Sequence, residues 1–363
     1  MEIGVQMIFQ KWGYGDAMSD SQVYDEEIRL GVLADALGFD ALWPVEHHFE
    51  DYSFCPDNAQ FLSFMAAKTK RIKLGTGAVI LPWNQPLRVA EKIAMLDELS
   101  GGRVVFGMGR GLSRREYEVM GIDMATSRDR FDEAAAMILE ALETGYVEGE
   151  GPFYPQPRAR IRPTPTRSFR GRVSAVAMSP DSLEQAAKLG VRMVVFSQKP
   201  MDKLVVDVDR YRALFSENHP AEPVPAPMVC DFMYCHGDPA LAEERARRYM
   251  SAYLTSVLHH YELASEHYKD VKGYEIYGRQ AETIQRIGPD ELYEMYLTVQ
   301  AWGTPDQILE KYAERRKQLG EFHITSCFRF AGMPYEEAEA SMRLYAKEVL
   351  PQVRRWERED VAA

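Results

Sequence analysis

The sequence predicts an α/β fold in which eight parallel strands close into a (β/α)8 barrel. Two observations lead to this prediction. Short apolar, β-branched runs alternate with longer amphipathic runs from one end of the chain to the other, and glycine joins a helix end to the following strand at three separate places. Strict alternation over eight units is typical of a closed barrel, with an open, doubly wound sheet as the alternative.

The first half of the chain contains four predicted strands, each a short run typical of a buried strand. They are residues 3–9, 39–43, 72–80 and 104–107. The helices predicted between and after them are residues 22–37, 59–68, 87–99, 114–120 and 127–144. Apolar residues of the first helix fall largely on one face, and Gly38 is expected to end it in a left-handed conformation.

The second half repeats the same order of elements. Its predicted strands are residues 173–178, 193–196, 228–235 and 322–330, and its helices are residues 181–189, 203–217, 239–253, 305–319 and finally 335–349. Gly190 and Gly320 stand, like Gly38, where a helix meets a strand, which is the short connection of a parallel sheet. Thr304 and Gln307 form a capping-box pattern that we interpret as structural.

Two segments interrupt the alternation. Residues 146–170 are rich in proline and arginine and are predicted to be a surface excursion without regular structure. Residues 258–302, charged and rich in tyrosine, follow the seventh strand and its helix, and we predict that they form an active-site lid. His259, His260 and the nearby tyrosines are placed on the surface of this lid. The whole chain, residues 1–363, is then a single barrel domain.

The composition excludes several classes of function. A net charge of −12 argues against a nucleic-acid or anionic-membrane partner. No run approaches 18 apolar residues and no basic leader is present, so we expect no membrane span and a cytoplasmic protein. The four cysteines are expected to be reduced, buried thiols. Cys230 and Cys235 lack a second pair of ligands at zinc spacing, and we predict no metal.

The run Glu46-His47-His48-Phe49 contains the strongest candidates for chemistry. It directly follows the second predicted strand, which in a barrel places it at the face that carries active sites. Two histidines and a carboxylate are costly to bury, and imidazoles titrate near neutral pH. Acid/base or ligand contact is favoured over a structural hydrogen-bonded cluster, and a metal site comes last because the other strand ends add no histidine or aspartate cluster.

Two later loops are suited to binding an anion. Gly107-Met108-Gly109-Arg110-Gly111 follows the fourth strand, but Leu112 stands where a dinucleotide fingerprint has a third glycine. Its glycines let backbone N–H groups approach a ligand, and Arg110 offers a planar fork; the alternative is a tight turn with a surface arginine. Ser179-Pro180-Asp181-Ser182 opens a helix, either as a phosphate cradle or as an ordinary cap that begins at Ser179.

Taken in order, these motifs resemble the bacterial luciferase-like flavin monooxygenases. The runs that carry the resemblance are residues 46–49, 74–82, 86–91, 96–103, 106–112 and 121–124, with Ser127 and Arg128. The resemblance covers the first 200 residues well and the remainder by architecture. It implies a TIM-type (β/α)8 barrel, a homodimer formed through helices early in the chain, and reduced FMN supplied by a separate flavin reductase.

The resemblance also implies roles for individual residues. His47 matches the catalytic base near the flavin, with His48 in support. Arg110, Ser179 and Ser182 match positions that hold the FMN phosphate, and Gly77-Ala78 matches a non-prolyl cis peptide beneath the flavin ring. The full set of cofactor-binding positions is Gly77, Ala78, Met108, Arg110, Arg128, Ala177, Met178, Ser179 and Ser182.

Three positions depart from the light-emitting α chain. Met108 stands where that chain has a reactive cysteine, Ser197 where it has a tryptophan, and Met178 where it has an acidic residue. These differences leave flavin binding intact, because backbone groups and Arg110 can provide it. They argue against light emission and against a long-chain aldehyde substrate.

The activity implied is that of an FMNH2-dependent monooxygenase. Such an enzyme uses O2 through a flavin C4a-(hydro)peroxide to oxygenate a small organic substrate at a carbonyl or an electron-rich carbon, and His47 moves the controlling proton. Two alternatives stay open: a deazaflavin-dependent hydride-transfer enzyme of the same fold, and a non-catalytic flavin-binding partner subunit. The substrate itself depends on residues 258–302 and on apolar residues at the strand ends.

Overall fold

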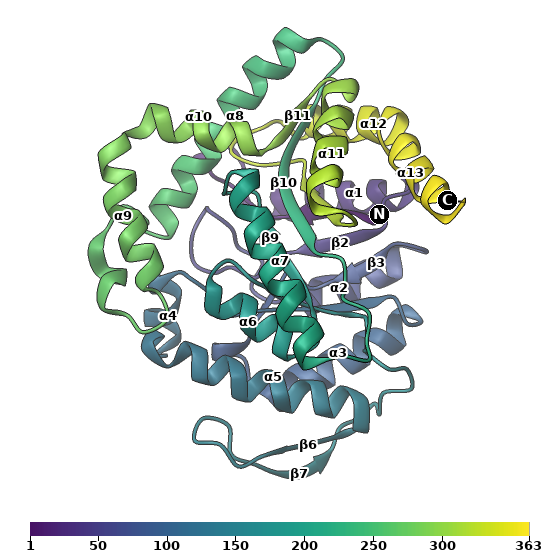
Figure 1. The fold of residues 1–363 in the computed structure, drawn as a ribbon, viewed down its shortest axis with the longest axis vertical. Helices are drawn as coiled ribbons and strands as arrows, with labels where there is room; N and C mark the ends of the chain where they lie inside the picture. The colour runs from purple at the N-terminus through teal and green to yellow at the C-terminus, as the bar shows by residue number, and fades with distance from the viewer. Residues whose placement is uncertain (363) are drawn as a thin grey trace.

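The computed structural model describes the backbone of residues 1–362 and the side chains of residues 1–356. Parallel strands form a closed ring, in which each strand pairs with the next and β12 returns to β1 (Figure 1). The ring consists, in order, of β1 (Ile3–Met7), β2 (Ala41–Pro44), β3 (Lys73–Gly75) with β4 (Val79–Ile80), β5 (Val104–Gly109), β8 (Val173–Val176), β9 (Arg192–Phe196), β10 (Met228–Cys235) and β12 (His323–Cys327). The predicted eight-stranded parallel barrel is confirmed.

Helices surround this ring, as the amphipathic runs predicted. They are α1 (Asp20–Leu37), α2 (Asn58–Lys68), α3 (Pro86–Ser100), α4 (Arg114–Met120), α5 (Ser127–Thr144), α6 (Pro180–Lys188), α7 (Met201–Asn218), α8 (Pro239–His260), α11 (Pro305–Leu319) and α12 (Tyr335–Glu348). Gly38, Gly190 and Gly320 all adopt positive φ at the predicted helix-to-strand junctions. Among the helices of residues 1–362, none combines the length and apolar character needed to cross a bilayer.

A single large side chain, Trp43, occupies much of the barrel interior. A Cβ atom on Gly4 would lie 2.7 Å from its indole ring, and one on Gly75 would lie 2.4 Å from it. Both glycines therefore make room for the indole. Its small cluster also contains Val105 and Met228 and forms the floor beneath the strand ends.

The third strand is interrupted, which corrects the prediction of one continuous strand over residues 72–80. β3 ends at Gly75, and the peptide bond between Gly77 and Ala78 is cis, as the resemblance implied. The Thr76 hydroxyl accepts a hydrogen bond from the Gly107 N–H and donates one to the Gly107 carbonyl, both at 2.7 Å. These hydrogen bonds hold residues 76–78 beside β5, although residues 76–78 do not belong to a regular strand.

The prediction that residues 146–170 lack regular structure was wrong. β6 (Tyr146–Gly149) and β7 (Gln156–Arg160) form an antiparallel hairpin below the barrel in Figure 1. Val147 is buried, and the Arg158 guanidinium lies 3.9 Å from the centre of the Tyr146 ring. Pairing between the two strands satisfies backbone groups that a loop would leave to water.

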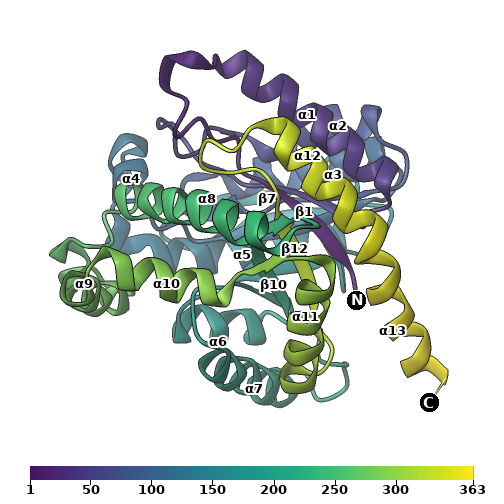
Figure 2. The same ribbon diagram turned by 90° about the horizontal axis from the view of Figure 1, so that it is seen from above.

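Residues 258–302 are also more regular than a loop. α8 extends through His260, beyond its predicted end, and is followed by η4 (Glu266–Asp270), α9 (Glu275–Ile287), α10 (Pro289–Val299) and β11 (Ala301–Gly303), which pairs with β10. Figures 1 and 2 both place α9 and α10 on the side of the molecule away from α13 (Leu350–Ala362). α13 was missed, because Pro351 follows the predicted last helix; proline is tolerated in a first helical turn.

Candidate active site

A cavity of about 190 Å³ opens where the strands end, the face that the barrel prediction favoured. Its walls come from the segment after β2, the β3–β4 junction, the loop after β5, the start of α6, and residues between 253 and 280. The predicted site residues that line it are His47, Gly77, Ala78, Arg110, Met178, Ser179 and Ser182. The remaining four, His48, Met108, Arg128 and Ala177, are packed outside the cavity wall.

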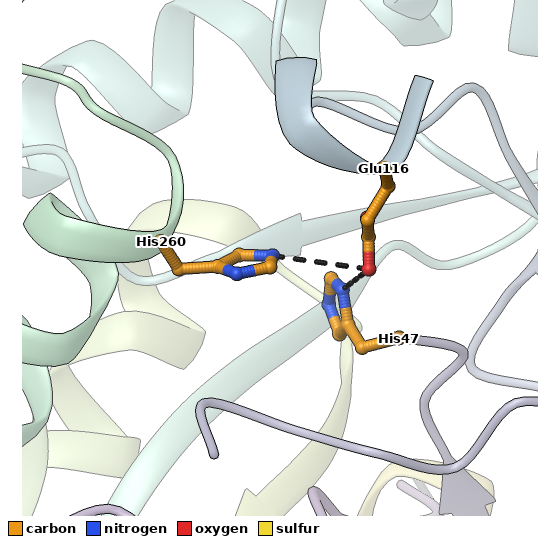
Figure 3. A group of neighbouring side chains, drawn as sticks. All are labelled: His47, Glu116 and His260. Atoms are coloured by element: carbon orange, nitrogen blue, oxygen red, sulfur yellow. Dashed lines mark hydrogen bonds and ion pairs between the residues drawn. The ribbon is translucent and has the colours of Figure 1, made fainter. Parts of the chain in front are cut away.

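His47 is held at both ring nitrogens. Its Nδ1 lies 3.1 Å from Oε1 of Glu116 (Figure 3). Its Nε2 lies 3.1 Å from the hydroxyl of Tyr261. Because a carboxylate only accepts, Nδ1 carries the proton and Nε2 is the acceptor for Tyr261. Glu116 thus fixes the tautomer of His47, and Nε2 is the nitrogen available for proton transfer on the cavity side.

Glu116 remains a carboxylate although it is buried. It lies in the first turn of α4, whose N-cap is Ser113, and it also accepts a 2.8 Å hydrogen bond from the backbone N–H of His48. Burial opposes its ionisation, but the charge and hydrogen bond of His47, together with His260, lower the pKa of Glu116 below its ordinary value. Sequence reasoning missed this residue, because nothing in its local spacing distinguishes it from a surface glutamate.

His260 is buried in the site, so its predicted place on the lid surface was wrong. Its Nδ1 lies 2.7 Å from Oε2 of Glu50, and its ring stacks on Tyr52 at 4.3 Å. Burial, reinforced by the charge of His47, lowers the pKa of His260 to about 4, so the ring is neutral at pH 7. The physical reason for the correction is the extra length of α8, whose last turn carries this side chain back toward the barrel.

Three side chains converge on a donor set that could hold a metal ion. The ligand atoms of His47, Glu116 and His260 lie within 4.8 Å of one another, and Nε2 of His260 is 3.9 Å from Oε1 of Glu116 (Figure 3). Imidazole nitrogens and a carboxylate oxygen are ligands of zinc and similar ions. These three side chains suit either proton transfer or the binding of an ion. The sequence analysis predicted no metal, and of the three residues only His47 lies at the end of a predicted strand.

His48 lies outside the cavity lining, next to Glu46. Its Nε2 lies 3.6 Å from Oε1 of Glu46, which is also buried. The Glu46 carboxylate accepts hydrogen bonds from the Trp83 indole at 2.7 Å, the Asn84 amide at 2.9 Å and the Ile80 backbone at 3.1 Å. Glu46 therefore secures β4 and the turn that follows it, and the two histidines have separate roles.

Two arginines supply unsatisfied donors beside the cavity. Arg110 donates from Nη2 to the Gly273 carbonyl at 2.8 Å, whereas its Nη1 is buried without a hydrogen-bond partner. Nε and Nη2 of Arg128 are also buried without a partner. Burial lowers the pKa of Arg128, and the positive charge of Arg110 acts in the same direction. Neighbouring guanidinium groups with unpaired N–H donors fit a phosphate, which would satisfy both.

The predicted helix cap lies on the same cavity. The Ser179 hydroxyl accepts from the Ser182 N–H at 3.3 Å, and the Ser182 hydroxyl accepts from the Ser179 N–H at 2.9 Å. This reciprocal pair confirms Ser179 as the N-cap of α6. The N-terminus of α6, with its two hydroxyls, thus lines the same cavity as Arg110, an arrangement suited to an anion.

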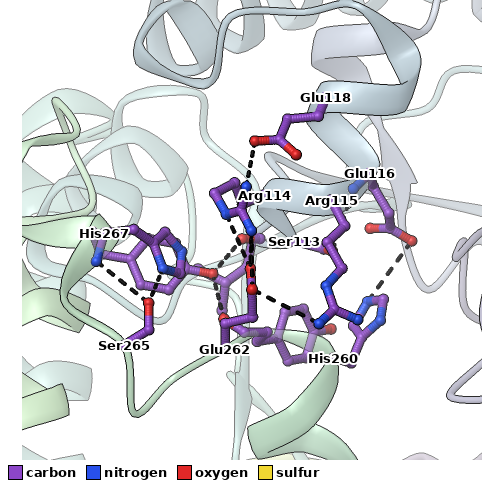
Figure 4. Close-up of polar contacts among 12 residues, drawn as sticks. Ser113, Arg114, Arg115, Glu116, Glu118, His260, Glu262, Ser265 and His267 are labelled. Atoms are coloured by element: carbon purple, nitrogen blue, oxygen red, sulfur yellow. Dashed lines mark hydrogen bonds and ion pairs between the residues drawn. The ribbon is translucent and has the colours of Figure 1, made fainter.

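The segment after α8 is fastened to the glycine-rich loop after β5. The Tyr268 hydroxyl donates to the Leu112 carbonyl and the Tyr274 hydroxyl to the Gly111 carbonyl, each at 2.8 Å. Arg114 forms two hydrogen bonds to Glu262 (Figure 4). Both tyrosines are buried, which corrects their predicted surface position. The segment therefore covers the loop that carries Arg110.

Comparison with known proteins gives one consistent result. The sequence profile described as "Luciferase-like monooxygenase" matches residues 1–321. The alkanal monooxygenase alpha chain of Photobacterium leiognathi is 26% identical over 345 residues, which cover 93% of this chain and 95% of that protein.

Two solved structures share the fold over nearly the whole chain. Monooxygenase RslO1 from Streptomyces bottropensis has a TM-score of 0.79 and 27% identity, with 97% of this chain and 100% of that chain covered. The oxygenating constituent of 3,6-diketocamphane monooxygenase from Pseudomonas putida, solved in complex with FMN, has a TM-score of 0.71 and 20% identity over 97% and 98% of the two chains.

Proposed function

Because the chain belongs to the luciferase-like monooxygenase family, we propose that it is an FMNH2-dependent monooxygenase, the oxygenase of a two-component system with a separate flavin reductase. Its substrates are O2 and an organic molecule that reacts at a carbonyl or an electron-rich carbon. A solved neighbour that is itself an oxygenating constituent in complex with FMN supports this assignment. The proposal includes a homodimer in the cytoplasm.

The observation that carries the proposal is the set of unpaired guanidinium donors beside the α6 cap. Arg110 and Arg128 would hold the phosphate of FMN, with Ser179 and Ser182 at the helix N-terminus. Gly77 and Ala78, which the resemblance places beneath the flavin ring, line the same cavity. Reduced flavin, when bound, supplies the electrons that activate O2.

His47 is the acid/base group of this proposal. Its Nδ1 proton is directed to Glu116, so Nε2 takes or gives a proton on the cavity side. Tyr261, the hydrogen-bond partner of Nε2, comes from the proposed lid, residues 258–302. Leu263, Tyr274 and Tyr277 of the same segment line the cavity and would exclude water from it.

Anaerobic titration with reduced FMN, followed by mixing with ¹⁸O2 and a panel of ketones, tests the proposal. We expect FMN to bind and the product to gain one ¹⁸O atom. Arg110→Ala should weaken FMN binding by roughly 10- to 100-fold, since a charge-assisted hydrogen bond contributes about 1.5–3 kcal/mol. The matched control is Arg130→Ala, which removes a guanidinium that packs on Phe153 of the hairpin side. An absence of FMN binding and of ¹⁸O in any product would refute the proposal.

The same titration decides between the two alternatives. Tighter binding of a reduced deazaflavin, with hydride transfer that does not need O2, would replace FMN as the cofactor. An isolated chain that binds FMN but turns over only with a second, different subunit would be a non-catalytic partner. The contacts of His47 with Glu116 and Tyr261 favour a catalytic chain, because a mere partner subunit has no need to fix a tautomer.

A further inference from the structure

A second and larger cavity adjoins the first. It has a volume of about 710 Å³ and lies between α7, α8, α9, α10 and α11, beyond the end of β9. The residues that line both cavities are Met178, Gln198, Val257, Leu263, Tyr277 and Gln280. The two cavities therefore share a wall at the edge of the proposed flavin site. Sites for drug-sized ligands typically measure about 300–1,000 Å³, which includes this volume.

Apolar side chains from four helices form the walls of this second cavity. They include Leu204 on α7, Leu258 on α8, Ile284 and Ile287 on α9, and Leu292 and Val299 on α10. Most of these side chains are partly exposed to the open space, although they are branched aliphatic residues. A contiguous apolar surface that remains open to solvent indicates a ligand that covers it.

The charged side chains around this cavity have partners within the protein or are exposed to solvent, so they do not require a charged ligand. Its basic groups are used within the protein: Lys199 pairs with Asp207 at 2.6 Å, Arg315 with Asp231 at 2.8 Å, and Lys311 donates to the Thr298 carbonyl at 2.5 Å. Burial lowers the pKa of Lys311 to about 8, so its ammonium group loses its proton more readily than that of an ordinary lysine. The acidic side chains of the lining, Glu291, Glu294 and Glu314, are exposed at the rim.

Polar groups gather where the two cavities join. Gln198 follows β9 and Gln280 lies on α9, and both belong to the shared lining. Each amide offers one acceptor and two donor positions, which suits a carbonyl or hydroxyl group of a ligand. A ligand in the large cavity would thus present its polar end toward the small one.

We propose that this second cavity, the space lined by α7, α8, α9, α10 and α11, is the substrate chamber, and that the substrate is a neutral, largely apolar molecule of about drug size. Its single polar end, which carries the reacting carbonyl or electron-rich carbon, lies between Gln198 and Gln280. The inference rests on the proposed function for the reaction itself, whereas the binding chemistry of the chamber is independent of it.

Titration with Nile red, a neutral fused-ring dye whose fluorescence rises in apolar surroundings, tests the chamber directly. We expect the wild-type protein to bind the dye, and saturating FMN not to displace it. Ile284→Trp and Leu258→Trp narrow the chamber from two different helices, and each should weaken dye binding at least tenfold. Arg286→Trp, on the opposite and exposed face of α9, is the matched control and should bind the dye as the wild type does.

The outcomes separate this inference from the proposed function. FMN affinity should stay unchanged in all three tryptophan variants, which also shows that they fold. Displacement of the dye by FMN, unchanged dye binding in both chamber variants, or tighter binding of an anionic dye such as 1-anilinonaphthalene-8-sulfonate would overturn the chamber assignment. Loss of dye binding in the chamber variants without any ¹⁸O incorporation by the wild type would support the chamber and sink the monooxygenase proposal instead.

Discussion

His47 has a hydrogen-bond partner on each ring nitrogen, and the two partners come from different elements. Glu116 on α4 holds Nδ1, and Tyr261 after α8 holds Nε2. Because the buried carboxylate of Glu116 only accepts, it keeps the proton of the neutral ring on Nδ1 and leaves Nε2 as the nitrogen that exchanges a proton. Glu116 is thus a positioning residue, and its effect on turnover can be measured without removing His47.

Glu116→Gln should lower kcat roughly 10- to 100-fold, the usual effect of removing a partner that orients a catalytic group. FMN affinity should be unchanged, because the Glu116 carboxylate contacts His47 and the His48 backbone and makes no hydrogen bond to Arg110 or Arg128. The loss should appear in kcat, since a glutamine amide can donate to Nδ1 as well as accept from it and so no longer fixes the tautomer of His47. A kcat equal to that of the wild type would contradict this role. Glu118→Gln, on the exposed side of the same helix, is the control.

Exhaustive dialysis against EDTA should leave turnover unchanged. The reason is that Oε1 of Glu116 already accepts hydrogen bonds from His47 and from the His48 backbone, so this oxygen has its partners without an ion. Metal content by mass spectrometry before and after dialysis is the accompanying measurement. Activity that is lost with EDTA and restored by Zn²⁺ would instead make His47, Glu116 and His260 a metal centre.

The free energy of unfolding should fall as pH drops from about 6.5 to about 4. His260 has a pKa of about 4 in the folded chain against an ordinary 6.5, so the unfolded state binds more protons in this window. Full stability is present above pH 6.5 and is lost as pH falls, by roughly 3 kcal/mol for this residue. Urea unfolding of the wild type and of His260→Gln at pH 4 to 7 measures the difference. Parallel curves for the two proteins would show that His260 contributes nothing to the loss.

Among the elements, the segment of residues 261–287 is held to the barrel by polar contacts and by one small apolar cluster. Tyr268 and Tyr274 bind the carbonyl groups of Leu112 and Gly111, and both pack with Tyr117 and Met124 in a cluster separate from the main core. A segment held in this way opens more easily than the packed barrel does. The elements that carry the site therefore differ in local stability.

Tyr274→Phe should increase amide hydrogen exchange in residues 261–287 by about tenfold or more. The substitution leaves the Gly111 carbonyl without its partner, which costs about 1–3 kcal/mol. Exchange in β1 and β12 should not change. Tyr293→Phe removes an exposed hydroxyl contact to Thr255 on α8 and serves as the control. Faster exchange throughout the barrel would mean that Tyr274 stabilises the whole fold instead of this segment.

The whole molecule presents exposed apolar side chains on two early helices. Phe64 on α2 is 48% exposed, and Met95 and Leu99 on α3 are 47% and 61% exposed. Since α2 and α3 pack against each other, these residues can form one patch, and exposed apolar patches commonly mark interfaces between proteins. This location agrees with the predicted homodimer through helices early in the chain.

Leu99→Glu should convert a dimer to a monomer, because a buried, unpaired carboxylate disfavours an apolar interface. Light scattering during size-exclusion chromatography gives the mass of each species. Val206→Glu, at an equally exposed position on α7, should remain dimeric. A wild-type protein that elutes as a monomer, or a Leu99 variant that stays dimeric, would place the interface elsewhere or remove it.

Features that depend on near neighbours in the chain could be predicted from the sequence. The eight barrel strands, the positive φ of Gly38, Gly190 and Gly320, and the caps at Ser179 and Thr304 follow from hydrophobic period and from residues within one helical turn. The position of His47 at the face where the strands end follows from the same alternation. Each of these features depends on residues close together in the chain, so a single sequence is enough to predict it.

The surroundings of His47, in contrast, depend on how distant parts of the chain pack together. Glu116 and His260 come from helices far away in the chain, and their burial depends on how α4 and the last turn of α8 pack against the barrel. The break in the third strand, the hairpin β6–β7 and the added helix α13 likewise depend on contacts with other elements. Pairing and burial between distant segments have no local signature, which is why the sequence placed His260 at the surface and the structure places it in the site.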